Sequence, residues 1–248
     1  MKNHIAQAGA TLTLNNKGEL TTVDLYSREG LNLISNLWIK SATQHRLMYE
    51  PTWLGRPVIQ FPTDIVAIQE MIWTLKPDVI VETGVAHGGS LVLSASILEL
   101  IGKGKVVGVD IEIRPHNRAA IEAHPLKHRI ELIEGSSIAS ETMDAVRSTV
   151  GDAGTVLVFL DSNHTEAHVL QELELYGKLV TPGSYIVAHD GAQAWVWDIP
   201  RGLPEWKENH PLGAIHKFLE SHSEFVPDPH WTRLGITCSP DGWLKKVA

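Results

Sequence analysis

The chain is poor in the features that mark secreted and membrane proteins. It has a single cysteine, Cys238, in 248 residues, so it cannot form an internal disulfide, and we expect a reducing compartment. The longest wholly apolar run, Val156–Leu160, is far shorter than the roughly 20 residues that cross a bilayer. The first residues, Met1–His4, lead into mixed polar sequence without an apolar signal segment. We therefore expect a cytoplasmic protein with no membrane partner.

Basic charge is also scarce. The sequence has 21 Lys and Arg against 29 Asp and Glu, for a formal net charge of −8. Repulsion from phosphates then argues against a nucleic-acid partner. The 43% hydrophobic and 20% charged residues are ordinary globular values, which exclude disorder for most of the chain. The length fits one α/β domain with a modest extension, and the expected ligand is a small molecule.

The composition changes near Pro62, and this divides the chain into an N-terminal extension, 1–60, and a main domain, 61–248. In the extension, alternation on both sides of Asn15–Gly18 predicts a small hairpin. In the domain, Thr63 is the expected N-cap of a helix that ends before Pro77. Helical stretches then alternate with five apolar runs, at 78–83, 105–110, 129–133, 155–160 and 184–188. The alternation predicts an α/β fold with a mainly parallel sheet and helices on both faces, and we expect an antiparallel edge from strands at 231–237 and 242–246.

A glycine-rich segment joins the first of these strands to its helix. It contains Glu82, Gly84, Gly88 and Ser90. Glycines at this place let the backbone approach a ligand and leave free N–H groups at a helix start, although a merely tight turn would look the same. Asp110 ends the second strand, where a carboxylate can accept both ribose hydroxyls of a nucleoside. Together the two features indicate a cofactor that contains adenosine.

The carboxylate of Glu82 helps to choose that cofactor. Two residues before Gly84, it would repel the pyrophosphate of a dinucleotide, whereas S-adenosylmethionine (SAM) offers a sulfonium and an ammonium. The segment also lacks the Gly-x-Gly-x-x-Gly pattern, which disfavours a dehydrogenase. The alternative is that Glu82 is an exposed acid at a strand end. After the third strand, Ser136 and Ser137 either edge the adenine pocket or form a plain turn.

The fourth and fifth strands are each followed by an aspartate, Asp161 and Asp190. If these strands are neighbours, the two carboxylates can share one cation, and Mg²⁺ suits them better than zinc. His189 faces away from Asp190 on a straight strand, but a chain that turns at Gly191 could bring both to the ion. His164 is a candidate base because a histidine titrates near neutrality; a surface role is the alternative.

Several longer stretches together form a familiar pattern. They are Trp53–Gln60, Val81–Ser90, Gly108–Asp110, Ile133–Ser137, Leu160–Thr165, Pro182–Tyr185 and Pro240–Leu244. In these stretches the chain resembles the cephalosporin hydroxylase family, which despite its name has the SAM-dependent methyltransferase fold and is similar to the macrolide-sugar O-methyltransferases. The resemblance implies a Rossmann-like fold, with SAM and Mg²⁺ as cofactors.

The resemblance also implies roles for individual residues. With the argument for Glu82, the expected SAM site comprises Glu82, Gly84, Gly88, Ser90, Asp110, Ser136, Ser137 and Asp161. Asp161 and Asp190 match the magnesium-binding acids, with His189 as a possible third ligand at a position that is an acid in some relatives. His164 matches the proposed catalytic base. Relatives assemble as homo-oligomers, and the N-terminal extension would suit such contacts.

These expectations converge on an enzyme, a SAM-dependent, Mg²⁺-assisted O-methyltransferase that acts on a hydroxyl of a sugar or another small natural product. The alternative is a cofactor-binding accessory component of a partner oxygenase, as the family name hints. Methyl transfer to any acceptor would decide between them.

Overall fold

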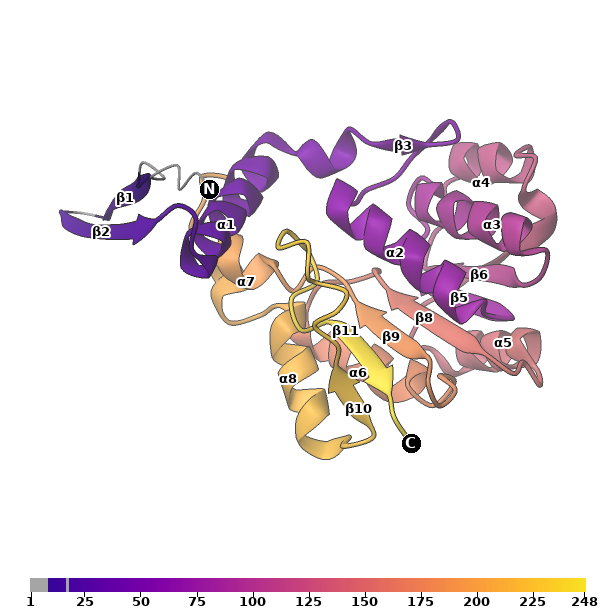
Figure 1. Ribbon diagram of the computed structural model, residues 1–248. Coiled ribbons are helices and arrows are strands. Elements are labelled where there is room, and N and C mark those ends of the chain that lie inside the picture. The colour runs from indigo at the N-terminus through magenta and orange to yellow at the C-terminus, as the bar shows by residue number, and fades with distance from the viewer. Residues whose placement is uncertain (1–8, 17) are drawn as a thin grey trace, which may run out of the picture.

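The computed structural model describes residues 9–16 and 18–248 (Figure 1). Two parts of the sequence expectations lie outside these ranges: the segment Met1–His4, and Lys17 in the expected hairpin turn. A seven-stranded sheet forms the centre of the molecule, in the order β10-β11-β9-β8-β5-β6-β7. Its strands are β5 (Val79–Thr83), β6 (Lys105–Asp110), β7 (Ile130–Glu134), β8 (Val156–Leu160), β9 (Tyr185–Ala188), β10 (Phe225–Pro227) and β11 (Trp243–Lys246). This confirms the α/β fold and its mainly parallel sheet.

The strand order places a ligand crevice beside β5. The chain runs outward from β5 through β6 to β7, then crosses back to β8 on the other side of β5, and all these pairings are parallel. In doubly wound sheets, ligands bind outside the carboxyl ends of the strands at such a reversal. Thr83 and Leu160 are partners in the register of β5 with β8. The residues directly after these two positions therefore meet at the crevice.

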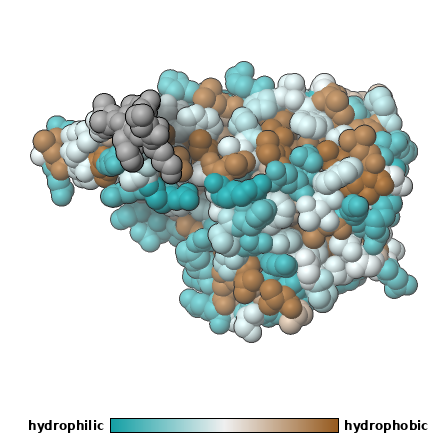
Figure 2. Space-filling model, in the orientation of Figure 1, coloured by the Kyte–Doolittle hydropathy of each residue, from teal (hydrophilic) through white to brown (hydrophobic). Residues whose placement is uncertain are grey.

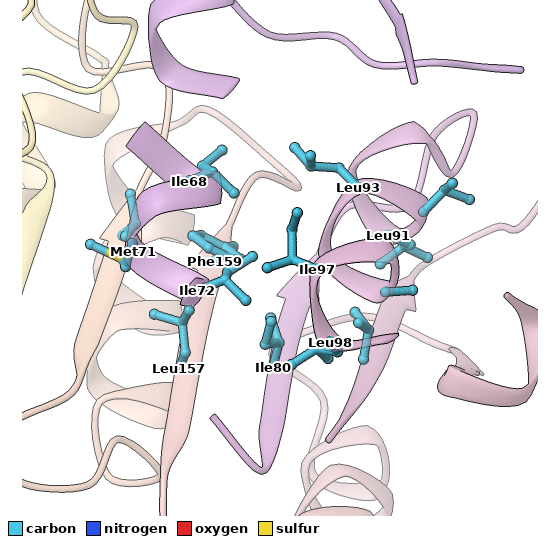
Figure 3. Packing of buried hydrophobic residues seen from close by; sticks show 14 of the residues in the cluster. Ile68, Met71, Ile72, Ile80, Leu91, Leu93, Ile97, Leu98, Leu157 and Phe159 are labelled. Atoms are coloured by element: carbon cyan, nitrogen blue, oxygen red, sulfur yellow. The ribbon is translucent and has the colours of Figure 1, made fainter. Parts of the chain in front are cut away.

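Helices cover both faces of the sheet because its central strands are apolar on both sides. Ile80 packs into one core cluster, whereas Val79 and Val81 pack into the other. Figure 3 shows the first cluster, in which α2 (Pro62–Leu75) and α3 (Gly89–Ile101) pack over β5 and β8. The helices that supply residues to the second cluster are α5 (Ser140–Val150), α6 (Glu166–Tyr176) and α8 (Pro211–Ser221). The short α4 (Pro115–Glu122) contributes Ile121 to the first cluster.

The N-terminal segment contains the expected hairpin and a helix that the sequence did not indicate. Strands β1 (Thr11–Asn16) and β2 (Glu19–Asp24) pair antiparallel and project from the body (Figure 1). Helix α1 (Arg28–His45) comes next and contacts α7 (Gln193–Val196). Its buried face includes Gly30 and Ser35, while several of its large apolar side chains are exposed. Apolar residues do recur at helical spacing here, at Leu31, Ile34, Trp38 and Ala42, but Leu33 and Leu37 fall on another face and blur the pattern.

Two expectations about element boundaries were wrong. Residues 231–237 form turns, and β10 takes the expected place beside β11, which pairs antiparallel with β9. The apolar character of this segment serves side-chain packing, because Trp231 is buried and stacks on Trp243 with ring centroids 6.2 Å apart. Thr63 is not an N-cap, since α2 begins one residue earlier with Pro62, whose fixed φ suits a first helical position.

The surface gives no sign of a membrane span. None of the helices in the described part of the chain has the length and apolar character needed to cross a bilayer. On the face drawn in Figure 2, apolar residues form separate patches among hydrophilic ones. The division of the chain at residue 60 and the association of copies through the N-terminal extension stay predictions.

Candidate active site

Two aspartates and a histidine meet at the carboxyl ends of β8 and β9. The two strands are parallel neighbours, as the argument for a shared cation required. Asp161 directly follows β8, and Asp190 lies in the turn after β9 with φ of 60°. His164 Nε2 is 3.0 Å from Asp190 Oδ2 and 3.5 Å from Asp161 Oδ1. One ligand atom from each of the three residues lies within 4.8 Å of the others.

The electrostatics of this cluster favour a positive charge at its centre. Burial alone would lower the pKa of His164, but the carboxylates of Asp190 and Asp161 outweigh it and hold the pKa well above the usual histidine value. Burial opposes ionisation of Asp190 as well, yet the imidazolium keeps the pKa of this carboxyl low. For Asp161, burial dominates and raises the pKa. From the sequence, we expected His164 to titrate near the ordinary histidine value. The two carboxylates shift its pKa upward.

The donor set fits a hard divalent cation. Mg²⁺ prefers carboxylate oxygens and is commonly held by one or two of them together with waters. Asp161 and Asp190 converge from adjacent strands on one point, and both side chains are partly accessible. Gln60 Nε2 donates to Asp161 Oδ2 over 3.2 Å and helps to orient this carboxylate. These two aspartates are therefore the residues that could hold Mg²⁺.

His189 does not join this cluster. Its ring is buried, with Nδ1 2.9 Å from Ser239 Oγ, and it stacks on Phe159 with centroids 5.8 Å apart. Successive side chains of an extended segment point to opposite sides, and the turn at Gly191 comes after His189, too late to reverse its direction. The suggested third ligand thus lies beneath the site, in the core.

Glu82 is buried and does not sit on the surface as a strand-end acid. It is 3% exposed, and Ser90 Oγ donates a hydrogen bond to it. Burial raises its pKa to about 8, and the nearby charge of Asp161 acts in the same direction. Gly84 has φ of 92°, and a Cβ there would collide with the backbone carbonyl of Asp161. The loops after β5 and β8 therefore pass in close contact, which requires the glycine.

Asp110 supports the glycine-rich loop from the neighbouring strand. Its Oδ2 accepts the backbone N–H groups of Val85, over 2.8 Å, and Ala86, over 3.2 Å. In the structure this carboxylate shapes the loop. Its binding to ribose hydroxyls, expected from the sequence, stays a prediction. Gly88 has φ of 77°, and a Cβ there would collide with the side chain of Ile121 on α4.

The two serines after β7 lie apart from the cluster of acids. Ser137 is buried, and its Oγ is 3.0 Å from His168 Nε2, which in turn lies 3.6 Å from the carboxylate of Glu172. Ser136 accepts the Ala139 N–H through its backbone oxygen in the turn that precedes α5. His168 Nε2 also lies 3.3 Å from Ser162 Oγ, and this histidine is not part of the cluster of Asp161, His164 and Asp190.

A cavity of about 530 Å³ opens above the cluster. Gly84, Ser90, Asp161, His164 and Asp190 line it, whereas Glu82, Asp110, Ser136 and Ser137 do not. Further lining residues come from the end of α1, the residues after it, and the segment from α7 onward. They are Thr43, Arg46, Met48, Tyr49, Gln193, Val196, Arg201 and Trp206. They carry no motif, and nothing in their spacing could have brought them together.

Residues 45–247 match the family described as Rhamnosyl O-methyltransferase/CmcI. The chain belongs to this family. The rhamnosyl O-methyltransferase of Mycobacterium leprae (strain TN) is 31% identical over 141 residues, which are 56% of this chain and 59% of that protein. The chain thus spans less than two thirds of the length of this curated relative.

Solved structures share the fold at low identity. A structure of CmcI with Mg and SAM has a TM-score of 0.59 at 19% identity and covers 81% of this chain and 78% of that chain. An O-methyltransferase from Bacillus cereus in complex with SAH has a TM-score of 0.50 at 17% identity, covering 80% and 81%. Membership of the Rhamnosyl O-methyltransferase/CmcI family and the Rossmann-like methyltransferase fold confirm the resemblance found in the sequence.

Proposed function

We propose that this protein is a SAM-dependent O-methyltransferase that uses Mg²⁺ and acts on a hydroxyl of a sugar or another small natural product. The observation that carries the proposal is the cluster of Asp161, His164 and Asp190 on the floor of a cavity, beside the glycine-rich loop. The names of the M. leprae relative and of the CmcI structure with Mg and SAM support the same chemistry.

Different residues act on the cofactor and on the acceptor. Glu82, buried behind Gly84, is mainly neutral at pH 7 in the ligand-free protein, and binding of a cofactor that carries a sulfonium and an ammonium favours its ionised form. Asp161 and Asp190 would hold Mg²⁺, which lowers the pKa of a bound hydroxyl. With a cation bound at the two carboxylates, their effect on the pKa of His164 would be offset, so that the neutral ring can accept the hydroxyl proton at Nε2. The side-chain amide of Gln193 lies 2.9 Å from Nδ1, and with its oxygen turned toward Nδ1–H it would hold the ring in this tautomer.

The transfer is a single displacement. The acceptor oxygen forms a bond to the methyl carbon while the bond from that carbon to sulfur breaks, and the proton goes to His164. The products are a methyl ether and S-adenosylhomocysteine. Positioning of the oxygen in line with sulfur supplies much of the acceleration, because the sulfonium is already a good leaving group.

Mass spectrometry after incubation with methyl-labelled SAM, Mg²⁺ and a panel of sugar and natural-product alcohols tests this activity. We expect one or more acceptors to gain a labelled methyl group on oxygen, with S-adenosylhomocysteine in equal amount. SAM binding without transfer to any acceptor would favour the accessory component of an oxygenase. A protein that does not bind SAM would contradict the proposal entirely.

Asp110→Ala is expected to weaken SAM binding about 10- to 150-fold, equivalent to about 1.5–3 kcal/mol. The carboxylate orders the backbone of Val85 and Ala86 and, in our proposal, pairs with the ribose hydroxyls. Isothermal titration calorimetry with SAM measures the effect. Asp144→Ala, which removes an exposed carboxylate on α5, is the matched control. Unchanged affinity in the Asp110 variant would remove this residue from the cofactor site.

A further inference from the structure

The cavity carries charges of both signs. Its floor holds the carboxylates of Asp161 and Asp190. Among the described residues that line it, Arg46 and Arg201 are the ones with a permanent positive charge, and both are exposed at the solvent side. A ligand in the cavity therefore has both the carboxylates of the proposed metal site and two solvent-exposed guanidinium groups around it.

Neither guanidinium is neutralised by the protein within the part of the chain that the structure describes. No carboxylate there lies within 4.0 Å of Arg46 or Arg201, whereas Arg118 pairs with Glu134 at 2.8 Å and Arg147 with Asp144 at 3.0 Å. The guanidinium of Arg46 lies over the ring of Tyr49, 4.3 Å from its centroid. This stacking orients the charge and leaves its hydrogen-bond donors available.

Two contacts join the chain segments that carry the arginines. The backbone N–H of Arg201 donates to Gln44 Oε1 on α1 over 3.1 Å. Lys40, also on α1, forms an ion pair of 2.6 Å with Asp198 in the segment that carries Arg201. Arg46 caps the C-terminus of this same helix. Both arginines therefore belong to one connected wall of the cavity.

We propose that the acceptor is an anionic molecule, whose carboxylate or phosphate binds Arg46 and Arg201 while its hydroxyl lies at Asp161 and His164. This inference rests on the proposed function and specifies its substrate class. Guanidinium groups match the oxygens of both anions in bidentate geometry. With a net charge of −8, the protein as a whole repels anions, so an anionic acceptor needs such a local basic site.

The anion and the hydroxyl together orient the acceptor. Apolar side chains, including Met48, Phe61, Val196 and Trp206, line the cavity. Polar side chains, including Gln60 and Gln193, line the cavity as well, but among the described lining residues only the two arginines carry the permanent positive charge that distinguishes an anionic group. Attraction at the arginines favours one orientation, with the anionic group at Arg46 and Arg201 and the hydroxyl at the floor of the cavity.

Matched acceptors test the proposal: methyl glucuronide against methyl glucoside for the carboxylate, and glucose 1-phosphate against glucose for the phosphate. Arg46→Gly suits the backbone, because Arg46 has φ of 59° at a helix C-cap where glycine is favoured. It is combined with Arg201→Gln. Arg147→Gln is the control, since it removes one arginine charge from an exposed site on α5, outside the cavity.

In the wild type, we expect kcat/KM for at least one anionic acceptor to exceed that of its neutral partner about tenfold or more. The preference should fall with rising salt and disappear in the double variant, mainly through KM, but persist in Arg147→Gln. The SAM dissociation constant should stay unchanged in every variant. The pair that shows the preference identifies carboxylate or phosphate as the recognised group.

Equal turnover of charged and neutral acceptors, or a preference that survives in the double variant, would overturn this inference and leave the proposed function standing. Weaker SAM binding in the double variant would also overturn it, by assigning the arginines to the cofactor carboxylate. Absence of methyl transfer to every acceptor would instead count against the proposed function. Calorimetric binding of the same pairs to the protein loaded with S-adenosylhomocysteine then decides the inference separately, and equal binding within each pair would reject it.

Discussion

His164→Ala is expected to slow methyl transfer about 10²–10⁴-fold, the usual contribution of a general base. His164 Nε2 is the nitrogen closest to the carboxylates where the acceptor hydroxyl would lie, and no other imidazole belongs to the cluster found among the described residues. Affinity for SAM should stay close to that of the wild type, because the glycine-rich loop and Asp110 are unaltered. Single-turnover measurements with labelled SAM report the chemical step, and calorimetry reports cofactor binding.

Chelation distinguishes the base from the metal site. A chelator should stop the wild-type reaction, and added Mg²⁺ should restore it. Mg²⁺ should not restore the His164 variant, because an ion at Asp161 and Asp190 cannot accept a proton. His216→Ala, which removes an exposed imidazole paired with Asp241, is the control. A His164 variant within about threefold of wild type would exclude this residue as the base, and full activity in chelator would remove the two aspartates from the mechanism.

Glu82→Gln is expected to stabilise the ligand-free protein by about 4 kcal/mol at pH 8. Burial raises the pKa of Glu82 to about 8 from an ordinary value of 4.5. The folded protein therefore binds more protons at this site than the unfolded chain between these two pH values. Stability that depends on Glu82 is complete below about pH 4.5 and decreases as the pH rises toward 8, whereas glutamine does not titrate and loses none.

Urea unfolding of the ligand-free protein at pH 5 and pH 8, in the presence of chelator, measures this difference. The two proteins should be similar at pH 5 and diverge at pH 8. Glu141→Gln, on the exposed side of α5, should show no such divergence. The Glu82 variant should also bind SAM more weakly, since glutamine cannot ionise when the cationic cofactor binds nearby. A stability difference that is the same at both pH values would contradict the assigned burial of a titrating carboxylate.

Much of the central fold was determined by local sequence. The strands β5, β6, β8 and β9 are short apolar runs bounded by glycine, proline or charged residues, and such runs are stable mainly when buried on both faces. Alternation with helices then requires parallel strands and places their carboxyl ends on one edge. Asp161 and Asp190 could therefore be expected to meet, because each comes at or just after the end of one of these strands.

The tertiary structure decided which side chains face the site. His189 and Asp190 are adjacent in sequence, yet one enters the core and the other the cavity, because the side-chain direction alternates until the chain turns. The residues 231–237 have strand-like composition but are held by the packing of Trp231, which depends on partners distant in sequence.

The local sequence did not predict that α1 and the segment after α7 line one cavity. Helix α1 buries Ser35, Ile39 and Ala42 but exposes Leu31, Ile34 and Leu37, so its sequence does not show which face packs against the body. Arg46 and Arg201 reach one cavity through the contacts of Gln44 and Lys40 with the segment after α7. Sequence spacing determines which side chains stand at the end of each strand, since that depends on neighbouring residues alone. Which distant loops close over those strand ends depends on long-range packing, and only the folded chain specifies it.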